Sequence, residues 1–118
     1  MYEVKATNFI KESQLSKKTN IEKLDTRDFM SKVLSIDLYK YRYKTQANDE
    51  KDNYGAIIDN INEVKQYNLP QEFISTDDEG INTNNLITGL IATAQEQAKQ
   101  IEDLTFRILE VERRNING

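Results

Sequence analysis

Residues 86–114 have the sequence LITGLIATAQEQAKQIEDLTFRILEVERR, and the spacing of the apolar residues in this stretch decides the fold. Steps of three and four residues alternate for about four heptads, which is the period of a helix with one continuous apolar seam. The sequence therefore predicts a helix from about Leu86 to about Arg114, with Thr83, Asn84 and Asn85 as candidate N-caps. The a positions are Ile87, Ala94, Ile101, Ile108 and Asn115, and the d positions are Leu90, Gln97, Leu104 and Val111.

This seam has two interpretations. It can join several copies of the chain in a helical bundle, or it can pack a single amphipathic helix on its own domain, and the pattern favours the bundle. Gln97 and Asn115 would weaken a bundle and set its register, and Arg107 at g could pair with Glu112 at e of a neighbouring helix. Ile at a with Leu at d does not by itself choose a trimer over a dimer.

The segments before this helix predict short elements. Asp25 and Thr26 precede an apolar helical pattern and indicate a short capped helix. Alternation over residues 38–44 and an apolar run over 54–58 predict two strands. Residues 57–67 have helical apolar spacing that ends before Pro70. Residues 73–81 are expected to form a hairpin that turns at Gly80.

The composition narrows the possible functions. A chain of 118 residues is long enough for one small domain. Its net charge of −4 provides no overall electrostatic attraction to a nucleic acid. The absence of cysteine excludes disulfides and a thiolate nucleophile, and the absence of histidine excludes a Ser-His-Asp triad and the commonest metal ligand. No apolar run approaches membrane-spanning length, and the first residues do not resemble a signal peptide. We expect no metal, cofactor or membrane partner.

Two further patterns have competing interpretations. Tyr39-Lys40-Tyr41-Arg42-Tyr43-Lys44 alternates aromatic with basic residues, as single-strand nucleic-acid binders do. The same alternation describes a strand with an aromatic core face and a basic solvent face, and this interpretation is favoured. The acidic run at residues 77–79 lacks the spacing of a calcium loop and indicates a solvated turn.

A possible nucleophile lies near the start of the chain, in the segment Ser13-Gln14-Leu15-Ser16-Lys17-Lys18-Thr19-Asn20-Ile21. Serine needs a base that is neutral near physiological pH, and lysine can serve where burial or a neighbouring positive charge favours its neutral form. Lys17 is such a neighbour for Lys18. A separation of five residues on a bent loop allows the amine of Lys18 to meet the hydroxyl of Ser13.

The order of these segments resembles the C-terminal intramolecular chaperone domain of bacteriophage tail spikes and fibres. This is the endosialidase-type, Ser/Lys self-cleaving peptidase family, and a related segment occurs in myelin regulatory factor. The resemblance covers about Ser13 to Val111. It rests on the Ser13–Ile21 segment, on Tyr39–Tyr43, on Gly55-Ala56-Ile57, on Leu69-Pro70, and on Leu86-Ile87, Leu90-Ile91 and Ala94-Gln95-Glu96 at the start of the long helix.

The resemblance implies a fold that is mainly α with small β elements (α+β), in which the C-terminal helix forms a homotrimeric helical bundle. Residues 1–12 would be the end of an upstream fibre segment, and residues 13–118 would be the chaperone domain that registers this fibre. Ser13 would attack the Glu12–Ser13 bond with Lys18 as its partner. The partners would be two further copies and the upstream tail fibre or spike, in the virion tail or in the host cytoplasm during assembly.

One departure from the family pattern keeps a second function open. The family commonly has Asp directly after the serine, and this chain has Gln14. The domain could therefore be a trimerisation or capping domain that stays attached to the fibre and never cleaves. A self-cleaving serine endopeptidase and a purely structural cap remain alternatives at this point.

Overall fold

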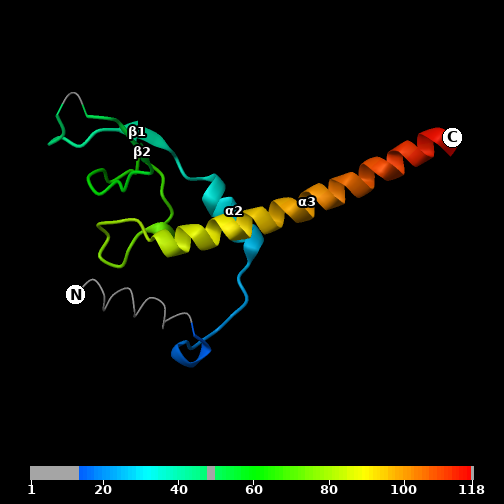
Figure 1. The fold of residues 1–118 in the computed structure, drawn as a ribbon, viewed down its shortest axis with the longest axis horizontal. Helices are drawn as coiled ribbons and strands as arrows, with labels where there is room; N and C mark the ends of the chain where they lie inside the picture. The colour runs from blue at the N-terminus through cyan, green and yellow to red at the C-terminus, as the bar shows by residue number, and fades with distance from the viewer. Residues whose placement is uncertain (1–13, 48–49, 118) are drawn as a thin grey trace.

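The computed structural model describes residues 14–47 and 50–117, and within them it combines helices with a small two-stranded sheet. This is the α+β mixture that the sequence predicted. Figure 1 shows one long helix that runs far beyond the rest of the chain, whose other segments gather around its first half. The elements in chain order are η1 (Leu15–Lys17), α2 (Thr26–Leu34), β1 (Tyr39–Tyr41), β2 (Asn53–Gly55), η2 (Gln71–Phe73) and α3 (Thr83–Asn117).

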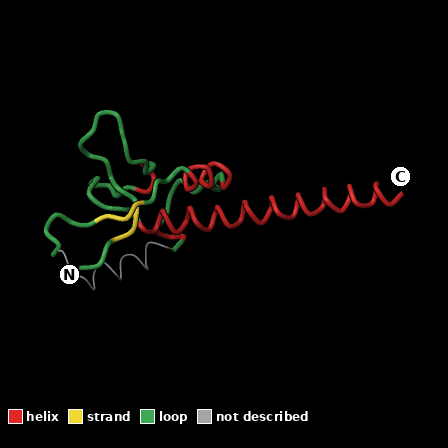
Figure 2. Tube along the Cα trace, turned by 90° about the horizontal axis from the view of Figure 1, so that it is seen from above, coloured by secondary structure: helices red, strands yellow, loops and turns green. Residues whose placement is uncertain are grey.

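The long helix α3 confirms the helix that the seam predicted, but it is longer at both ends. It begins at Thr83, and its N-terminal cap is Asn82, whose Oδ1 accepts a hydrogen bond from the backbone N–H of Asn85 at 3.0 Å. The prediction of a cap among residues 83–85 was therefore wrong by at least one residue. Figure 2 shows that the second half of α3 extends away from the other described segments.

The short helix α2 confirms the predicted capped helix. The carboxylate of Asp25 accepts a hydrogen bond from the backbone N–H of Asp28 at 3.1 Å, which satisfies one of the free donors at the helix start. Helix α2 crosses the first half of α3, as Figure 1 shows. Its apolar side chains at Phe29 and Val33 meet α3 and η2 at this crossing.

The core lies where α2, α3 and η2 meet, and it is thin. Among the described residues, only two apolar side chains are buried: the large ring of Phe73 and the small methyl group of Ala92. The ring of Phe73 packs edge-on against the ring of Phe29, with 5.7 Å between their centroids. Lys32 of α2 binds Glu72 of η2 at 2.5 Å, so an ion pair flanks the same junction.

Gly89 allows α2 and η2 to approach α3 closely. A Cβ atom built on Gly89 would lie 2.8 Å from Cγ2 of Val33 and 3.1 Å from Cε1 of Phe73. Both distances are shorter than ordinary carbon–carbon contacts. A glycine inside a helix lowers helix stability by about 1 kcal/mol relative to alanine. Here the missing side chain allows α2 and η2 to pack closely on α3.

The sheet confirms two predicted strands in shortened form. Strands β1 and β2 pair antiparallel, with Tyr39 opposite Gly55 and Tyr41 opposite Asn53. The prediction extended the first strand to residue 44, but the backbone N–H of Tyr43 donates to the side chain of Gln46 at 2.7 Å instead of to a strand. A local turn therefore ends β1.

The predicted helical stretch over residues 57–67 is wrong, because this segment is a loop. The carboxylate of Asp59 accepts hydrogen bonds from the backbone N–H groups of Gln66 and Asn62, at 2.8 and 3.1 Å. These bonds hold the pKa of Asp59 far below its ordinary value. The loop thus organises around one side-chain acceptor, and Ile61 and Val64 point into solvent.

The predicted hairpin over residues 73–81 is confirmed, although its turn differs. Ile74 and Ile81 form an antiparallel bridge, and the backbone N–H of Ser75 donates to the carbonyl of Gly80 at 2.7 Å. The residue with left-handed backbone is Asp78, at φ 59°, and not Gly80. Aspartate tolerates this conformation better than most residues because its short side chain can form local hydrogen bonds.

Replacing Gly89 with alanine is expected to destabilise the domain although alanine is the better helix former. The added methyl group collides with Val33 and with the buried ring of Phe73, and such overpacking outweighs the gain in helix propensity by roughly 1–2 kcal/mol. Chemical denaturation monitored by circular dichroism measures the change. The matched control is Gly55→Ala, whose Cβ would meet only Tyr41, at 3.9 Å. Equal stability of Gly89→Ala and the wild type would contradict the close approach.

Candidate functional site

Helix α3 presents two different faces, and its own chain covers only one of them. The covered face consists of Gly89, Ala92, Thr93 and Glu96, which are all buried under α2 and η2. Gly89, Ala92 and Glu96 occupy c and f positions of the heptad register, on the side of the helix away from a and d, and Thr93 occupies a g position at the edge of the seam. The contacts within one chain therefore leave the apolar seam free.

The seam is exposed along its whole length. Ile87 and Leu90 are about half exposed even where α2 packs on the opposite side of the helix. In the second half of α3, every residue from 97 to 116 is exposed. The large apolar seam residues of this half are Ile101, Leu104, Ile108 and Val111, with exposed fractions of 64, 55, 57 and 53%. Three further apolar side chains that lie off the seam are exposed as well: Phe106, Leu109 and Ile116. A single helix with this much exposed apolar surface indicates an interaction surface.

A shallow hollow lies on the seam near the end of α3. Its lining includes Leu104, Arg107, Ile108 and Val111, which occupy positions d, g, a and d. Four residues in this arrangement form the hole that receives a side chain of a facing helix in coiled coils. Arg107, predicted to pair with Glu112 of a neighbouring helix, binds Asp103 of its own helix at 3.1 Å in the single chain.

Glu96 anchors the start of α2 to the middle of α3. Its Oε1 accepts hydrogen bonds from Oγ1 of Thr26 at 2.5 Å and from Nζ of Lys99 at 3.2 Å. The bond from Thr26, and then that from Lys99, lower the pKa of Glu96 below its ordinary value. Because Thr26 is the first residue of α2, this contact sets the point at which the preceding segment leaves the helices.

The segment before α2, residues 14–25, is called the arm below. All of its residues are exposed, and the hydrogen bonds described for residues 14–24 stay within the arm. The 3-10 helix η1 forms its beginning, and the backbone N–H of Lys18 donates to the carbonyl of Leu15 at 3.1 Å. Asn20 bends the arm, with φ at 51°.

The predicted pair of Ser13 and Lys18 is only partly visible. Lys18 lies directly after η1 with an extended backbone and an exposed side chain. Ser13 and the Glu12–Ser13 bond lie outside the described residues, as do residues 1–12. The distance between the hydroxyl and the amine therefore stays a prediction, as does the assignment of residues 1–12 to an upstream fibre.

Each tyrosine of the segment that alternates aromatic and basic residues packs against another tyrosine of the chain. Tyr39 packs edge-on against Tyr67, and Tyr41 against Tyr43, with centroid distances of 5.1 and 5.5 Å. Arg42 donates to the backbone carbonyls of Ala47 and Glu50, each at 2.5 Å. These contacts support the structural interpretation of the pattern over a base-stacking surface.

The acidic run at residues 77–79 forms the hairpin turn. The carboxylate of Asp77 accepts from the hydroxyl of Ser75 and from the backbone N–H of Glu79, and both contacts lower its pKa. Within residues 14–47 and 50–117, no three acidic side chains gather in a way that could hold a metal ion. No helix in this part of the chain combines the length and the hydropathy that crossing a membrane needs.

Comparison with known protein families identifies the family of this chain. A protein-family model described as chaperone of endosialidase matches residues 13–105, which is most of the chain. The chain belongs to the endosialidase chaperone family. The match runs from the proposed nucleophile into the second half of α3, and it confirms the resemblance that the sequence predicted. No curated protein and no solved structure matches the chain.

Membership in the endosialidase chaperone family supports a chaperone role for this chain. The described structure gives a packing role to three residues to which the sequence analysis assigned none. Gly89, Glu96 and Asn82 set how α2 and α3 meet and where α3 begins. A glycine in the middle of a strong helical pattern was the one available signal, because such a glycine usually marks a close contact.

Acid is expected to loosen the contact between Glu96 and Thr26. Because the pKa of Glu96 is lower in the folded state, its stabilisation is complete above the unfolded value of about 4.3 and is lost as the pH falls through the folded value. The melting temperature of the wild type should therefore fall more steeply in acid than that of Glu96→Gln. Thermal melts from about pH 7 to about pH 3 measure this difference.

The control for this experiment is Glu102→Gln, an exposed position of the same helix. It should keep the pH profile of the wild type. If Glu96→Gln and the wild type lost stability in parallel, the anchoring role of the Glu96 carboxylate would be refuted.

Proposed function

We propose that this domain is a C-terminal intramolecular chaperone that assembles as a homotrimer and registers an upstream phage tail fibre or spike. One observation carries the proposal: the seam of α3 is exposed, and the domain's own packing uses a different face of the helix. The alternative of a single amphipathic helix that packs on its own domain loses support, since the described chain offers the seam no cover. A second copy of the seam is the surface that fits it.

The hollow formed by Leu104, Arg107, Ile108 and Val111 supports helix-to-helix packing over a looser contact. A knob from a facing helix needs four residues in this arrangement, and α3 presents them without help from another element. The number of copies follows from the family resemblance. Ile at a and Leu at d would also suit a parallel dimer.

Such a trimer would solve a problem of folding entropy. Intertwined fibre strands must find one another in register, which requires many non-local contacts and makes the search slow. Helix α3 forms from local contacts, and its association holds the attached strands at high effective concentration. The chaperone would then act by proximity and would need no cofactor.

We further propose that the domain is released by cleavage of the Glu12–Ser13 bond. Ser13 would attack the carbonyl carbon of Glu12, and Lys18 would accept the hydroxyl proton and deliver it to the departing amino group of Ser13, which leaves Glu12 joined to Ser13 through an ester. Water would then hydrolyse this ester, giving a free carboxylate on Glu12 and restoring the Ser13 hydroxyl, and only this second step separates the domain from the fibre. The position of Lys18 directly after the turn η1, at the start of an exposed arm, supports access to this bond. Removal of the domain would leave the fibre kinetically trapped, because its unfolding route would no longer lead back to an assembled seed.

A second candidate is a trimerisation cap that stays attached to its fibre. Gln14, which stands where the family commonly has Asp, favours this function. Both candidates share the seam and differ only in the fate of the Glu12–Ser13 bond.

Replacing Ile101 with aspartate is expected to dissociate the assembly. Ile101 occupies the middle of the seam, and a carboxylate there would be buried without a partner in every copy. Sedimentation or light scattering should change from the mass of three chains to that of one. Gln95→Asp introduces the same charge at a b position of α3 and should remain assembled. A trimeric Ile101→Asp variant would show that the seam is assigned wrongly.

Cleavage is tested on a longer protein that carries the upstream fibre segment. A denaturing gel should show a smaller band for the wild type, and Ser13→Ala and Lys18→Ala should each abolish it while the assembly keeps its mass. The matched control Ser16→Ala changes a neighbouring serine of the same segment and should still be cut. A wild type that stays intact at all times would reject cleavage and leave the attached cap.

A further inference from the structure

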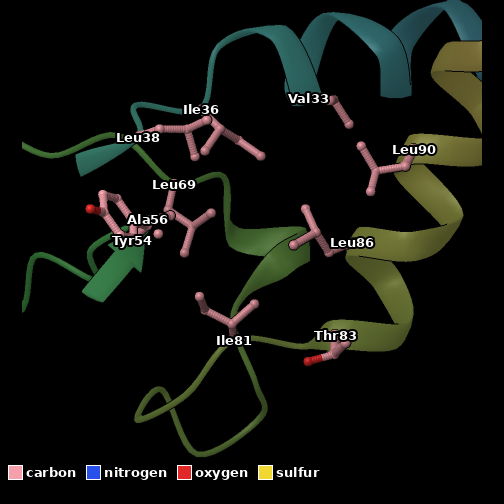
Figure 3. A pocket seen from close by; sticks show the side chains of 11 residues that line it. Val33, Ile36, Leu38, Tyr54, Ala56, Leu69, Ile81, Thr83, Leu86 and Leu90 are labelled. Carbon is pink, nitrogen blue, oxygen red and sulfur yellow. The ribbon is translucent and has the colours of Figure 1, made fainter. Parts of the chain in front are cut away.

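An apolar groove lies beside the first half of α3. Figure 3 shows its side chains converging from several parts of the chain: the end of α2 and the turn after it, the β2 region, the segments on either side of η2, and the start of α3. Its volume is about 470 Å³, which lies within the range of pockets that hold ligands. The groove is open, since Leu38 and Tyr54 are each 76% exposed. Its large apolar lining residues include Val33, Ile36, Leu38, Tyr54, Leu86 and Leu90.

The groove borders the seam of α3. Leu90 belongs to both, as a d position of the seam and as part of the groove wall, and Leu86 occupies the adjoining g position. A second copy that packs along the seam would therefore pass directly beside the groove. This continuity favours an occupant from a neighbouring copy over an unrelated molecule.

The arm carries a matching set of unpacked apolar side chains. Leu15 is 77% exposed, and Ile21 and Leu24 are also exposed. Exposed branched side chains at this density along a short segment cost free energy in water, and burying one of them typically contributes 1.5–3 kcal/mol, roughly. Burial of these side chains against another apolar surface would stabilise the arm, and the exposed apolar lining of the groove is such a surface.

The arm and the groove lie on opposite sides of α3. Figure 1 shows the arm leaving α2 below α3, whereas strands β1 and β2, the second of which lines part of the groove, lie above α3. A cyclic trimer joins each copy to the next by two different surfaces, one from each side of the protomer. Two apolar surfaces on opposite sides of the same helix meet this requirement.

We propose that the arm of one copy docks in the groove of the neighbouring copy, with Leu15 and Ile21 as its apolar anchors. This proposal rests on the trimer proposed above and adds a second contact to the seam. The arm is long enough: the eleven residue-to-residue steps from Leu15 to Thr26 span up to roughly 36 Å when extended, and packed helices lie about 8–10 Å apart. Three such contacts would close the ring.

Docking would tie the proposed cleavage site to the assembled state. Ser13 lies two residues before Leu15, so an arm held by the neighbouring copy holds Ser13 beside that copy as well. Lys18 lies between the two anchors and would be held at the same place. The single chain leaves the arm exposed, whereas the trimer would fix it.

Cross-linking between two single-cysteine variants tests this contact. The chain has no cysteine of its own, so Leu15→Cys and Leu38→Cys introduce the only thiols. The two variants are produced together, oxidised and run on a non-reducing denaturing gel. A covalent pair of chains is expected from this mixture, and none from Leu15→Cys mixed with Ile61→Cys, whose cysteine is exposed but outside the groove.

Two results would overturn the proposal and are distinguishable. If light scattering shows a trimer but no cross-link forms, the arm does not dock in the groove, and the trimer itself stands. If the scattering mass is that of one chain, the trimer fails and the arm contact fails with it. A double variant, Leu15→Cys with Leu38→Cys, that closes only within its own chain also overturns docking on a neighbour.

Serine substitutions give an independent measurement. Leu15→Ser and Leu38→Ser should each raise the concentration at which the trimer dissociates by about 10- to 100-fold, the usual effect of losing one buried leucine. The double variant should be no weaker than the weaker single variant, because both remove the same contact. Ile61→Ser should leave the dissociation unchanged, and fully additive losses would contradict direct contact.

Discussion

The contact at Gly89 determines how α3 is used. Val33 and Phe73 lie against the bare backbone at this position, so α2 and η2 are held on the c, f and g side of the helix. Glu96 fixes the other end of the crossing through Thr26. Because this packing occupies one side of α3, the a and d positions are left for another molecule. A side chain at residue 89 would move α2 outward and weaken this division of the helix into two faces.

The sequence predicts the elements whose signals are local. The spacing of Ile87, Leu90 and Ile101 predicts α3, and Asp25 predicts the start of α2, because periodicity and capping act over a few residues. The helical stretch at residues 57–67 fails because the carboxylate of Asp59 offers its neighbours' amides a better set of hydrogen bonds than a helix start would. The helix cap moves to Asn82 for the same kind of reason: several adjacent Asn and Thr residues can cap, and tertiary contacts choose among them.

The functional surfaces also differ in whether the sequence predicts them. The seam is visible in the sequence since one helix carries all of it. The groove is lined by residues that lie between Val33 and Leu90 in the sequence. No local sequence pattern predicts it, because only the tertiary fold brings these residues together. Ser13 and Lys18 were found from their spacing and from family resemblance. Their geometry depends on the proposed neighbour of the arm, which a sequence does not contain.

The thin core has a consequence for the life of a single copy. Phe73 and Ala92 are the buried apolar residues among those described, so one chain alone gains little from closing on itself. When association supplies much of the stability, the folded fraction depends on subunit concentration. A copy made without partners would therefore open often and be degraded, whereas complete sets would persist. Under the proposed function, the domain would therefore select for complete assemblies, because only fibres with their full number of strands would persist long enough to mature.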